Sequence, residues 1–272
     1  MAKFSVCMSV YHGDNAVFFR EALESIFTQT RKPDEVVLVV DGPVTNEIDV
    51  VIAEYSHKDT PLVVIRLAKN SGHAIARQTG LDAARYEYTA IMDSDDIAVS
   101  DRFEKQMAYI EQHPEVDALG GQINEFIGEL SNVVGTRSVP LTDGEIKTYL
   151  KSRCPMNLVT VMLKKEAVQK VGGYIDWYCE EDYYLWVRMT EQGMMFANLP
   201  DNLVNVRVGD EMYQRRGGWK YFESEAKLQR YMLKHKVISM PKYLYNVLLR
   251  FAVQVMMPNK VRGWVFRTFA RE

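Results

Sequence analysis

Short apolar segments alternate with helical patterns along the first third of the chain. Four segments have the β-prone, largely uncharged character of buried strands, and they span residues 4–10, 36–40, 62–67 and 88–92. Each is followed by a segment whose apolar residues return at helical spacing. Because parallel strands are joined by right-handed crossovers, this alternation predicts an α/β fold with a mostly parallel central sheet and flanking helices.

The first predicted helix should pack on the sheet through one apolar face, formed by Val17, Phe18, Leu23, Ile26 and Phe27. The helix predicted over 74–84 contains small residues that would allow close packing on a sheet. A fourth helix is predicted over 103–110.

After residue 113 the pattern changes to shorter β-like pieces. We expect these at 118–127, 133–139, 158–163 and 203–208, with a helix over 183–192 that turns Leu185, Trp186 and Met189 inward. The chain therefore divides into an α/β part (1–112), an α+β part of the same domain (113–218) and a helical extension (219–272).

The last part of the extension, residues 241–272, combines an apolar stripe with positive charge. It holds six basic residues and one acid, Glu272, and its apolar positions return at helical spacing: Leu244, Leu248, Phe251, Val255, Val261, Trp264, Val265 and Phe269. Such a segment suits an anionic membrane surface. A helix packed on the main domain would show a similar stripe, so both interpretations remain open.

Composition narrows the function classes. A net charge of −3 argues against a nucleic-acid-binding protein, which normally carries a basic excess. The three cysteines, Cys7, Cys154 and Cys179, are widely spaced and form no CxxC pair, which predicts reduced thiols in a cytoplasmic protein. No apolar window is long enough for a transmembrane helix.

The strand at 88–92 ends in three carboxylates, Asp93, Asp95 and Asp96. Carboxylates this close repel one another unless a cation or several N–H donors lie among them. Oxygen ligands with no nearby His or Cys favour Mg²⁺ or Mn²⁺ over zinc. The acids could equally cap the helix that follows, because Asp is a good N-cap residue.

Two other polar segments should lie at the same edge of the sheet. Asp41 follows the second strand, and residues 70–77 follow the third. Ligands of parallel α/β sheets bind at the carboxyl ends of the strands, so these groups predict a shared binding site.

Six pieces in this order resemble the family-2 inverting glycosyltransferases of GT-A fold, especially the small bacterial members that build polysaccharide and O-antigen repeat units. The resemblance covers nearly the whole chain. The pieces are Ser9-Val10-Tyr11, Asp41, Asn70-Ser-Gly-His-Ala-Ile-Ala-Arg77-Gln-Thr-Gly80, Asp93-Ser-Asp95-Asp96, Val171-Gly-Gly-Tyr174 and Glu181-Asp182-Tyr-Tyr-Leu-Trp-Val-Arg188.

The resemblance implies a nucleotide-binding half (1–112) and an acceptor-binding half (113–218). Asp95, with Asp93 beside it, would hold Mn²⁺ or Mg²⁺, and Asp93 would also lie near the ribose. Asp41 would accept a hydrogen bond from an N–H group of the nucleotide base. The other implied nucleotide-binding residues are Val10, Tyr11, Gly72 and Arg77.

The implied reaction is metal-dependent, inverting transfer of one sugar from a nucleotide-diphosphate sugar, most simply a UDP-sugar, to a glycan or polyprenyl-diphosphate-linked saccharide. Inversion needs one carboxylate base. By resemblance this is Asp182, with Glu181 as second choice. A lipid-linked acceptor would place the protein at the cytoplasmic face of the membrane.

One motif departs from the processive members of the family. These carry a QxxRW signature, whereas the nearest string here is Gln214-Arg-Arg-Gly-Gly-Trp219, which favours single-sugar transfer. Arg215 and Arg216 could reach the diphosphate or lie in an exposed loop.

Three other functions compete with this one. A sugar-1-phosphate nucleotidyltransferase is the enzymatic alternative, because such enzymes also combine an α/β nucleotide site with metal-binding acids. They usually carry a Gly- and Arg/Lys-rich loop after the first strand, whereas this position holds only Tyr11-His-Gly-Asp-Asn15. An NAD-dependent oxidoreductase lacks support because no strand is followed by GxGxxG. A non-catalytic nucleotide-sugar-binding module remains as the non-enzymatic alternative.

Overall fold

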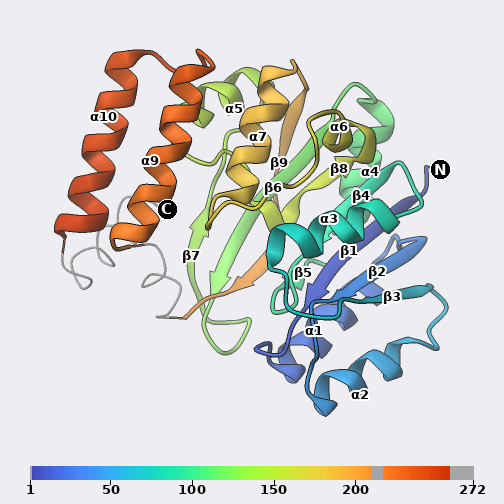
Figure 1. Ribbon diagram of the computed structural model, residues 1–272. Coiled ribbons are helices and arrows are strands. Elements are labelled where there is room, and N and C mark those ends of the chain that lie inside the picture. Colours follow the sequence, from blue (N-terminus) through green and yellow to red (C-terminus); the bar gives the residue numbers. More distant parts are fainter. Residues whose placement is uncertain (1, 210–216, 258–272) are drawn as a thin grey trace.

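The computed structural model describes residues 2–209 and 217–257, in which nine strands form one sheet with the order β3-β2-β1-β4-β8-β6-β9-β5, and β7 pairs with β6 (Figure 1). The first four strands run parallel to one another: β1 (Phe4–Val10), β2 (Glu35–Val40), β3 (Leu62–Arg66) and β4 (Tyr88–Met92). The connecting helices are α1 (Ala16–Phe27), α2 (Asn46–Tyr55) and α3 (His73–Ala83). The predicted α/β class with a mostly parallel central sheet is therefore confirmed.

Two apolar layers enclose this part of the sheet, because side chains of a strand alternate between its faces. Val6 and Met8 of β1 pack with residues of α1, whereas Cys7 packs in the layer that contains Ala74 and Leu81 of α3. The close packing predicted for α3 is present, since a Cβ on Gly80 would overlap the Cys7 sulfur atom.

The predicted face of α1 was partly wrong. Its buried residues are Phe19, Ala22, Leu23, Ile26 and Phe27, whereas Val17 is 55% exposed and Phe18 is half-buried. The side chain of Asn15 caps the helix by accepting from the backbone N–H groups of Val17 and Phe18. The first turn thus lies at the sheet edge, and the core-facing stripe begins one turn later.

The second half adds shorter strands and helices to the same sheet. Its elements are β5 (Ile97–Ala98), α4 (Arg102–Gln112), β6 (Ala118–Phe126), β7 (Val133–Arg137), α5 (Asp143–Leu150), β8 (Met162–Lys164), α6 (Lys165–Lys170), α7 (Glu181–Glu191) and β9 (Phe196–Arg207). The strand β8 runs antiparallel to β4 and β6, whereas β6 and β9 are parallel.

Two predicted strands differ from the structure. The segment 158–163 begins with a 3₁₀ turn, Leu158–Thr160, because the Thr160 hydroxyl donates to the Asn157 carbonyl and local bonds compete with the sheet ladder. The strand β9 begins at Phe196, before the predicted start at 203. An irregular register between β6 and β9 lets the ladder continue past Pro200.

Two helices stand at one end of the molecule, and α10 is the outer one in Figure 1. These are α9 (Trp219–Lys234) and α10 (Met240–Phe251), and a π-helical turn, Ala252–Met256, follows. The predicted helical extension is confirmed up to this turn, while the rest of its expected stripe lies outside the described residues. Within the described ranges, no helix combines the length and apolar character needed to cross a bilayer.

Candidate functional site

The carboxyl ends of β1, β2 and β4 meet at one edge of the sheet, because these strands are adjacent and parallel. This edge brings together the loops that begin at Tyr11, Asp41 and Asp93. The Asp41 N–H donates to the carbonyl of Val10 at 2.8 Å, and the Val10 side chain is buried in the core. The structure therefore brings these strand ends together at one edge of the sheet, as the sequence predicted.

A carboxylate that we did not single out from the sequence, Asp14, ties two of these loops together. Its Oδ2 accepts from the Tyr11 N–H at 3.0 Å and from the Ser94 hydroxyl at 2.8 Å. Burial raises the pKa of Asp14 although both hydrogen bonds act to lower it. The rule that found Asp41, an acid just after a strand at the binding edge, could have found Asp14.

Asp41 holds the loop before α3. Its two carboxylate oxygens accept from the backbone N–H groups of Ser71, at 2.7 Å, and Gly72, at 3.0 Å. Gly72 has a positive φ of 90°, and nothing lies within 4 Å of the Cβ position that it lacks. The loop therefore presents open backbone at this edge, and any residue other than glycine would be strained there.

The three carboxylates after β4 have different surroundings. Asp95 is exposed, yet desolvation of its carboxyl and the charges of Asp93 and Asp14 raise its pKa to about 6. Asp96 is buried and accepts from the Arg207 N–H at 2.9 Å, and burial raises its pKa well above the usual value. Asp96 thus faces β9, whereas Asp93 and Asp95 remain available at the edge.

Arg77 on α3 joins Asp93 to the start of α7. Its Nη2 donates to Asp93 Oδ1 at 3.1 Å, and its Nη1 donates to Glu181 Oε1 at 2.8 Å. Burial alone would lower the pKa of Arg77, but the two carboxylates outweigh it and the net shift is upward. One buried guanidinium therefore connects the strand-end carboxylates to the Glu181-Asp182 pair.

Asp182 lies in the first turn of α7, where the helix dipole stabilises negative charge. Its Oδ1 accepts from the Tyr183 N–H, and its Oδ2 lies 3.6 Å from the Cys154 sulfur atom. Burial, and then the charge of Asp182, raise the pKa of Cys154 well above its usual value. The thiol therefore stays protonated, and it donates to the Asp182 carboxylate.

Behind Asp182, Trp186 and Arg188 have structural roles. Trp186 is fully buried, and the Arg188 guanidinium donates to the carbonyls of Val171 and Gly173. These bonds hold the Gly172-Gly173 turn against α7.

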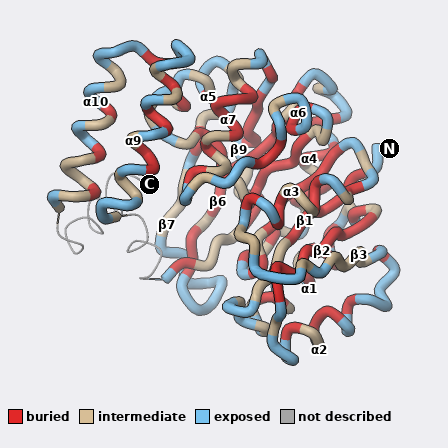
Figure 2. The backbone as a smooth tube through the Cα atoms, in the orientation of Figure 1, coloured by how far each residue is buried: buried red, intermediate tan, exposed pale blue. Residues whose placement is uncertain are grey.

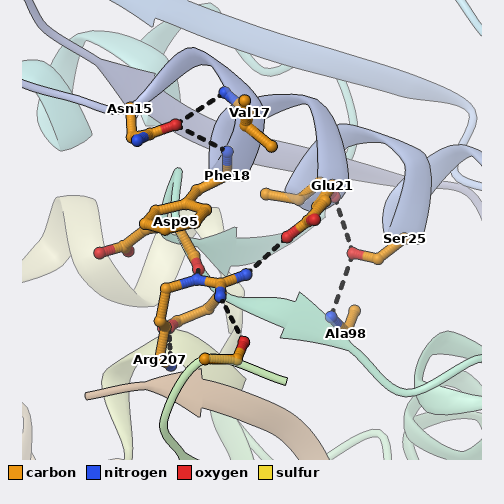
Figure 3. A network of polar contacts seen from close by, with 11 residues as sticks. Asn15, Val17, Phe18, Glu21, Ser25, Asp95, Ala98 and Arg207 are labelled. Carbon is orange, nitrogen blue, oxygen red and sulfur yellow. Dashed lines mark hydrogen bonds and ion pairs between the residues drawn. The ribbon is translucent and has the colours of Figure 1, made fainter. Parts of the chain in front are cut away.

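Arg207 at the end of β9 clamps the Asp95-Asp96 turn, a role that the sequence alone did not reveal (Figure 3). Its Nη2 lies 2.6 Å from Glu21 Oε2, and its Nε donates to the Asp95 carbonyl at 3.2 Å. The guanidinium carbon lies 3.8 Å from the centre of the Phe18 ring. These contacts fix the backbone that carries Asp95, and no pattern in the sequence links Arg207 to that turn.

The donor set fits a hard divalent cation only in part. Within the described residues, no group of three or more His, Cys, Asp or Glu side chains is placed to hold a metal ion. Mg²⁺ and Mn²⁺ are commonly bound by one or two carboxylates together with substrate phosphates and water. Asp93 and Asp95, whose mutual repulsion a cation would relieve, suit that arrangement.

The remaining predicted site residues are Tyr11, Arg215 and Arg216. Tyr11 lies at the shared edge beside Asp14, and its ring packs edge-on against His12. Arg215 and Arg216 lie outside the described residues.

Comparison with known proteins shows which family the chain belongs to. Residues 5–172 match the model of glycosyl transferase family 2. The chain is 42% identical to an uncharacterized glycosyltransferase of Haemophilus influenzae, over 99% of this chain and all of that protein. It is 34% identical to the UDP-Gal:alpha-D-GlcNAc-diphosphoundecaprenol beta-1,3-galactosyltransferase of Escherichia coli, over 99% of this chain and 97% of that one.

Two solved structures share the fold at low sequence identity. The S. aureus TarS 1-349 structure in complex with UDP-GlcNAc aligns with a TM-score of 0.66 and 19% identity, over 97% of this chain and 79% of that one. The mannosyltransferase PcManGT from Pyrobaculum calidifontis, in complex with GDP-Man and Mn²⁺, aligns with a TM-score of 0.64 and 18% identity, over 98% and 79%. With the family match covering more than half of its residues, this chain belongs to glycosyl transferase family 2 and is a glycosyltransferase.

Proposed function

We propose that this glycosyltransferase moves one sugar from a UDP-sugar to a hydroxyl group of a lipid-linked saccharide, with inversion, during synthesis of a surface polysaccharide. The observation that carries the proposal is the bridge from Asp93 through Arg77 to Glu181. It links Asp93, which would help to hold the cation of a nucleotide diphosphate, to the Glu181-Asp182 pair, which would activate an acceptor. The names of the E. coli relative and of the TarS complex support a UDP-sugar donor.

Residues 1–112 would bind the donor. Tyr11 and the backbone at Val10 would contact the base, and Asp41 would receive a hydrogen bond from it. Because both Asp41 oxygens already accept from the loop at Ser71 and Gly72, base binding would share these oxygens or shift that loop. Arg77 would neutralise negative charge near the ribose and diphosphate.

Asp95, with Asp93, would hold Mn²⁺ or Mg²⁺. When bound, the cation would stabilise the two negative charges that develop on the leaving diphosphate. The Mn²⁺ complex of the related fold supports this choice of metal. Arg207 would keep the Asp95 backbone in place through its contacts with Glu21 and the Asp95 carbonyl.

Asp182 would act as the general base. Its carboxylate takes the proton of the acceptor hydroxyl, the acceptor oxygen bonds to the anomeric carbon, and the bond from that carbon to the diphosphate oxygen breaks. UDP leaves with the bonding electron pair. A single displacement of this kind needs one base and inverts the anomeric centre. Membership of the glycosyltransferase family sets the nucleotidyltransferase alternative aside.

Residues 113–218 would hold the acceptor. The relative that acts on a diphosphoundecaprenol-linked sugar supports a lipid-linked acceptor, which would place this enzyme at the cytoplasmic face of the membrane.

The proposal is tested by incubating purified protein with Mn²⁺ and a panel of UDP-, GDP- and dTDP-sugars, with and without a diphosphate-lipid-linked N-acetylhexosamine. Nucleotide release and the anomeric configuration of the product, read by NMR, are measured. We expect release of UDP that needs metal and acceptor, and an inverted product. Two results would contradict the proposal: release of GDP or dTDP without any release of UDP, or a product with retained configuration.

A further inference from the structure

The helix α10 packs on the protein with its polar side. Its buried residues are Asn246 and Arg250, one helical turn apart on one face, and Gln254 in the π-helical turn that follows is buried too. The amide of Asn246 donates to the Lys151 carbonyl and to Gln229 Oε1, and Arg250 donates to the Ser152 carbonyl. This is the reverse of an ordinary surface helix, which buries its apolar stripe.

The apolar side of α10 and the turn after it points outward. Figure 2 shows α10 at the edge of the molecule with much of its outer side exposed. The exposed large apolar residues there are Met240, Leu244, Tyr245, Leu248, Leu249 and Met256. Leu248 is the most exposed of the leucines at 67%, and Trp219 adds an exposed indole that contacts the Phe251 ring. Large apolar side chains exposed together on one helix face are typical of an interaction surface.

Rotation of α10 cannot bury these leucines without breaking the bonds on its inner side. Arg250 Nε lies 3.0 Å from Glu225 Oε2, and the Gln254 amide donates to the same carboxylate. Leaving Glu225 buried without these partners would be costly. The outward direction of the leucines is therefore fixed by the fold.

Charge indicates what covers this surface. The helix α10 contains no acidic residue, and a groove of about 760 Å³ beside its start is lined by Lys151, Lys236 and Lys242 together with Met240. The sequence after Met257 contains four basic residues and one acid. A second copy paired through the same patch would set the basic groups of one copy against those of the other.

We propose that the outer face of α10 is the surface through which this protein docks on an anionic bilayer. The leucines and Trp219 enter the boundary between headgroups and acyl chains, and the three groove lysines face lipid phosphates. The choice of a bilayer rests in part on the proposed lipid-linked acceptor. Of the two interpretations of the C-terminal helices, docking through α10 is the one that its exposed face favours.

The test is flotation of the full-length protein with vesicles of phosphatidylcholine, either pure or with 30 mol % phosphatidylglycerol. We expect binding to the anionic vesicles that weakens with salt. The pair Leu244→Ser and Leu248→Ser should reduce the partition coefficient about ten-fold or more. Lys236→Gln and Lys242→Gln should each reduce it about five-fold.

Matched controls lie on the opposite part of the molecule. Val50 on α2 is 55% exposed, so Val50→Ser removes a comparable apolar group, and Lys32→Gln removes an exposed charge. Both should bind as the wild type does. Thermal melting confirms that each variant folds. If the double leucine variant melts at a lower temperature than the wild type, Leu248→Ser alone is used in its place.

Three results would overturn the proposal: equal partition of the leucine variants and the wild type, equal binding to neutral and anionic vesicles, or a dimer that the leucine variants dissociate. Binding is measured without substrates, so it is independent of catalysis. If the protein floats as expected but transfers no sugar, the proposed function fails and the docking surface stands.

Discussion

Asp93 and Glu181 accept hydrogen bonds from the same guanidinium, that of Arg77, although they belong to opposite halves of the chain. The Arg77 and Glu181 side chains are largely buried, at 9% and 16% exposure. The bridge fixes how far the carboxylates after β4 lie from the first turn of α7. In the proposed mechanism, donor binding and acceptor activation would be coupled through this one side chain.

Arg77→Gln should lower both donor affinity and turnover, because it leaves Asp93 and Glu181 to repel each other. The free energy of unfolding should fall by no more than about 3 kcal/mol, since the Asp93 end of the bridge is half-exposed. Calorimetric UDP binding and a denaturant melt measure the two effects. The control is Arg20→Gln, which breaks the exposed pair with Glu54 and should leave the denaturant melt close to that of the wild type. Unchanged UDP affinity in Arg77→Gln would separate this residue from the donor site.

Asp95→Asn should abolish the enhancement of UDP binding by Mn²⁺ while leaving the fold intact, because the side chain is exposed and supports no core packing. Titration of UDP with and without Mn²⁺ measures the effect. Asp49→Asn, at an exposed carboxylate paired with Arg66, serves as the matched control. A variant whose UDP binding still depends on Mn²⁺ as in the wild type would place the cation elsewhere.

Arg207→Ala should raise the Mn²⁺ concentration needed for half-maximal activity by about ten-fold or more, the range for groups that orient metal ligands. The reason is that Arg207 holds the Asp95 carbonyl and packs on the Phe18 ring. Saturating Mn²⁺ should restore much of the turnover, which a general loss of folding would not allow. An unchanged Mn²⁺ dependence would remove Arg207 from the positioning of this turn.

Arg250→Ala should destabilise the protein by about 3 to 5 kcal/mol, because it leaves a buried carboxylate, Glu225, without its cation. Thermal and denaturant melts measure the change. Removing the charge of both partners, with Arg250→Met and Glu225→Gln together, should recover much of the loss. If the single variant melts as the wild type does, the inner face of α10 does not fix the orientation of the helix.

Sequence reasoning worked best where local pattern and topology agree. The unbroken apolar run before Asp41 predicted a buried parallel strand, and strand order then placed Asp41 and Asp93 at one edge. Sequence reasoning failed where contacts between segments far apart in the chain determine the structure. The strand predicted over 203–208 begins at Phe196, because the irregular register with β6 carries β9 through Pro200.

The C-terminal helix shows the same limit. Its periodicity predicted a helix, but periodicity does not say which side faces the protein. Leu244 and Leu248 are exposed because the partners of Asn246 and Arg250 lie on α9 and in the loop after α5. The roles of Asp14 and Arg207 likewise depend on contacts between segments far apart in the sequence.

Asp182 as the general base is tested most directly by measuring UDP affinity and turnover of Asp182→Asn in the same Mn²⁺ buffer. Glu181→Gln serves as the comparison, because Glu181 contacts Arg77 and is the alternative base. We predict that Asp182→Asn binds UDP within about two-fold of the wild type and loses turnover by about 10² to 10⁴. Near wild-type turnover of Asp182→Asn, or a loss confined to UDP affinity, would contradict its role as the base.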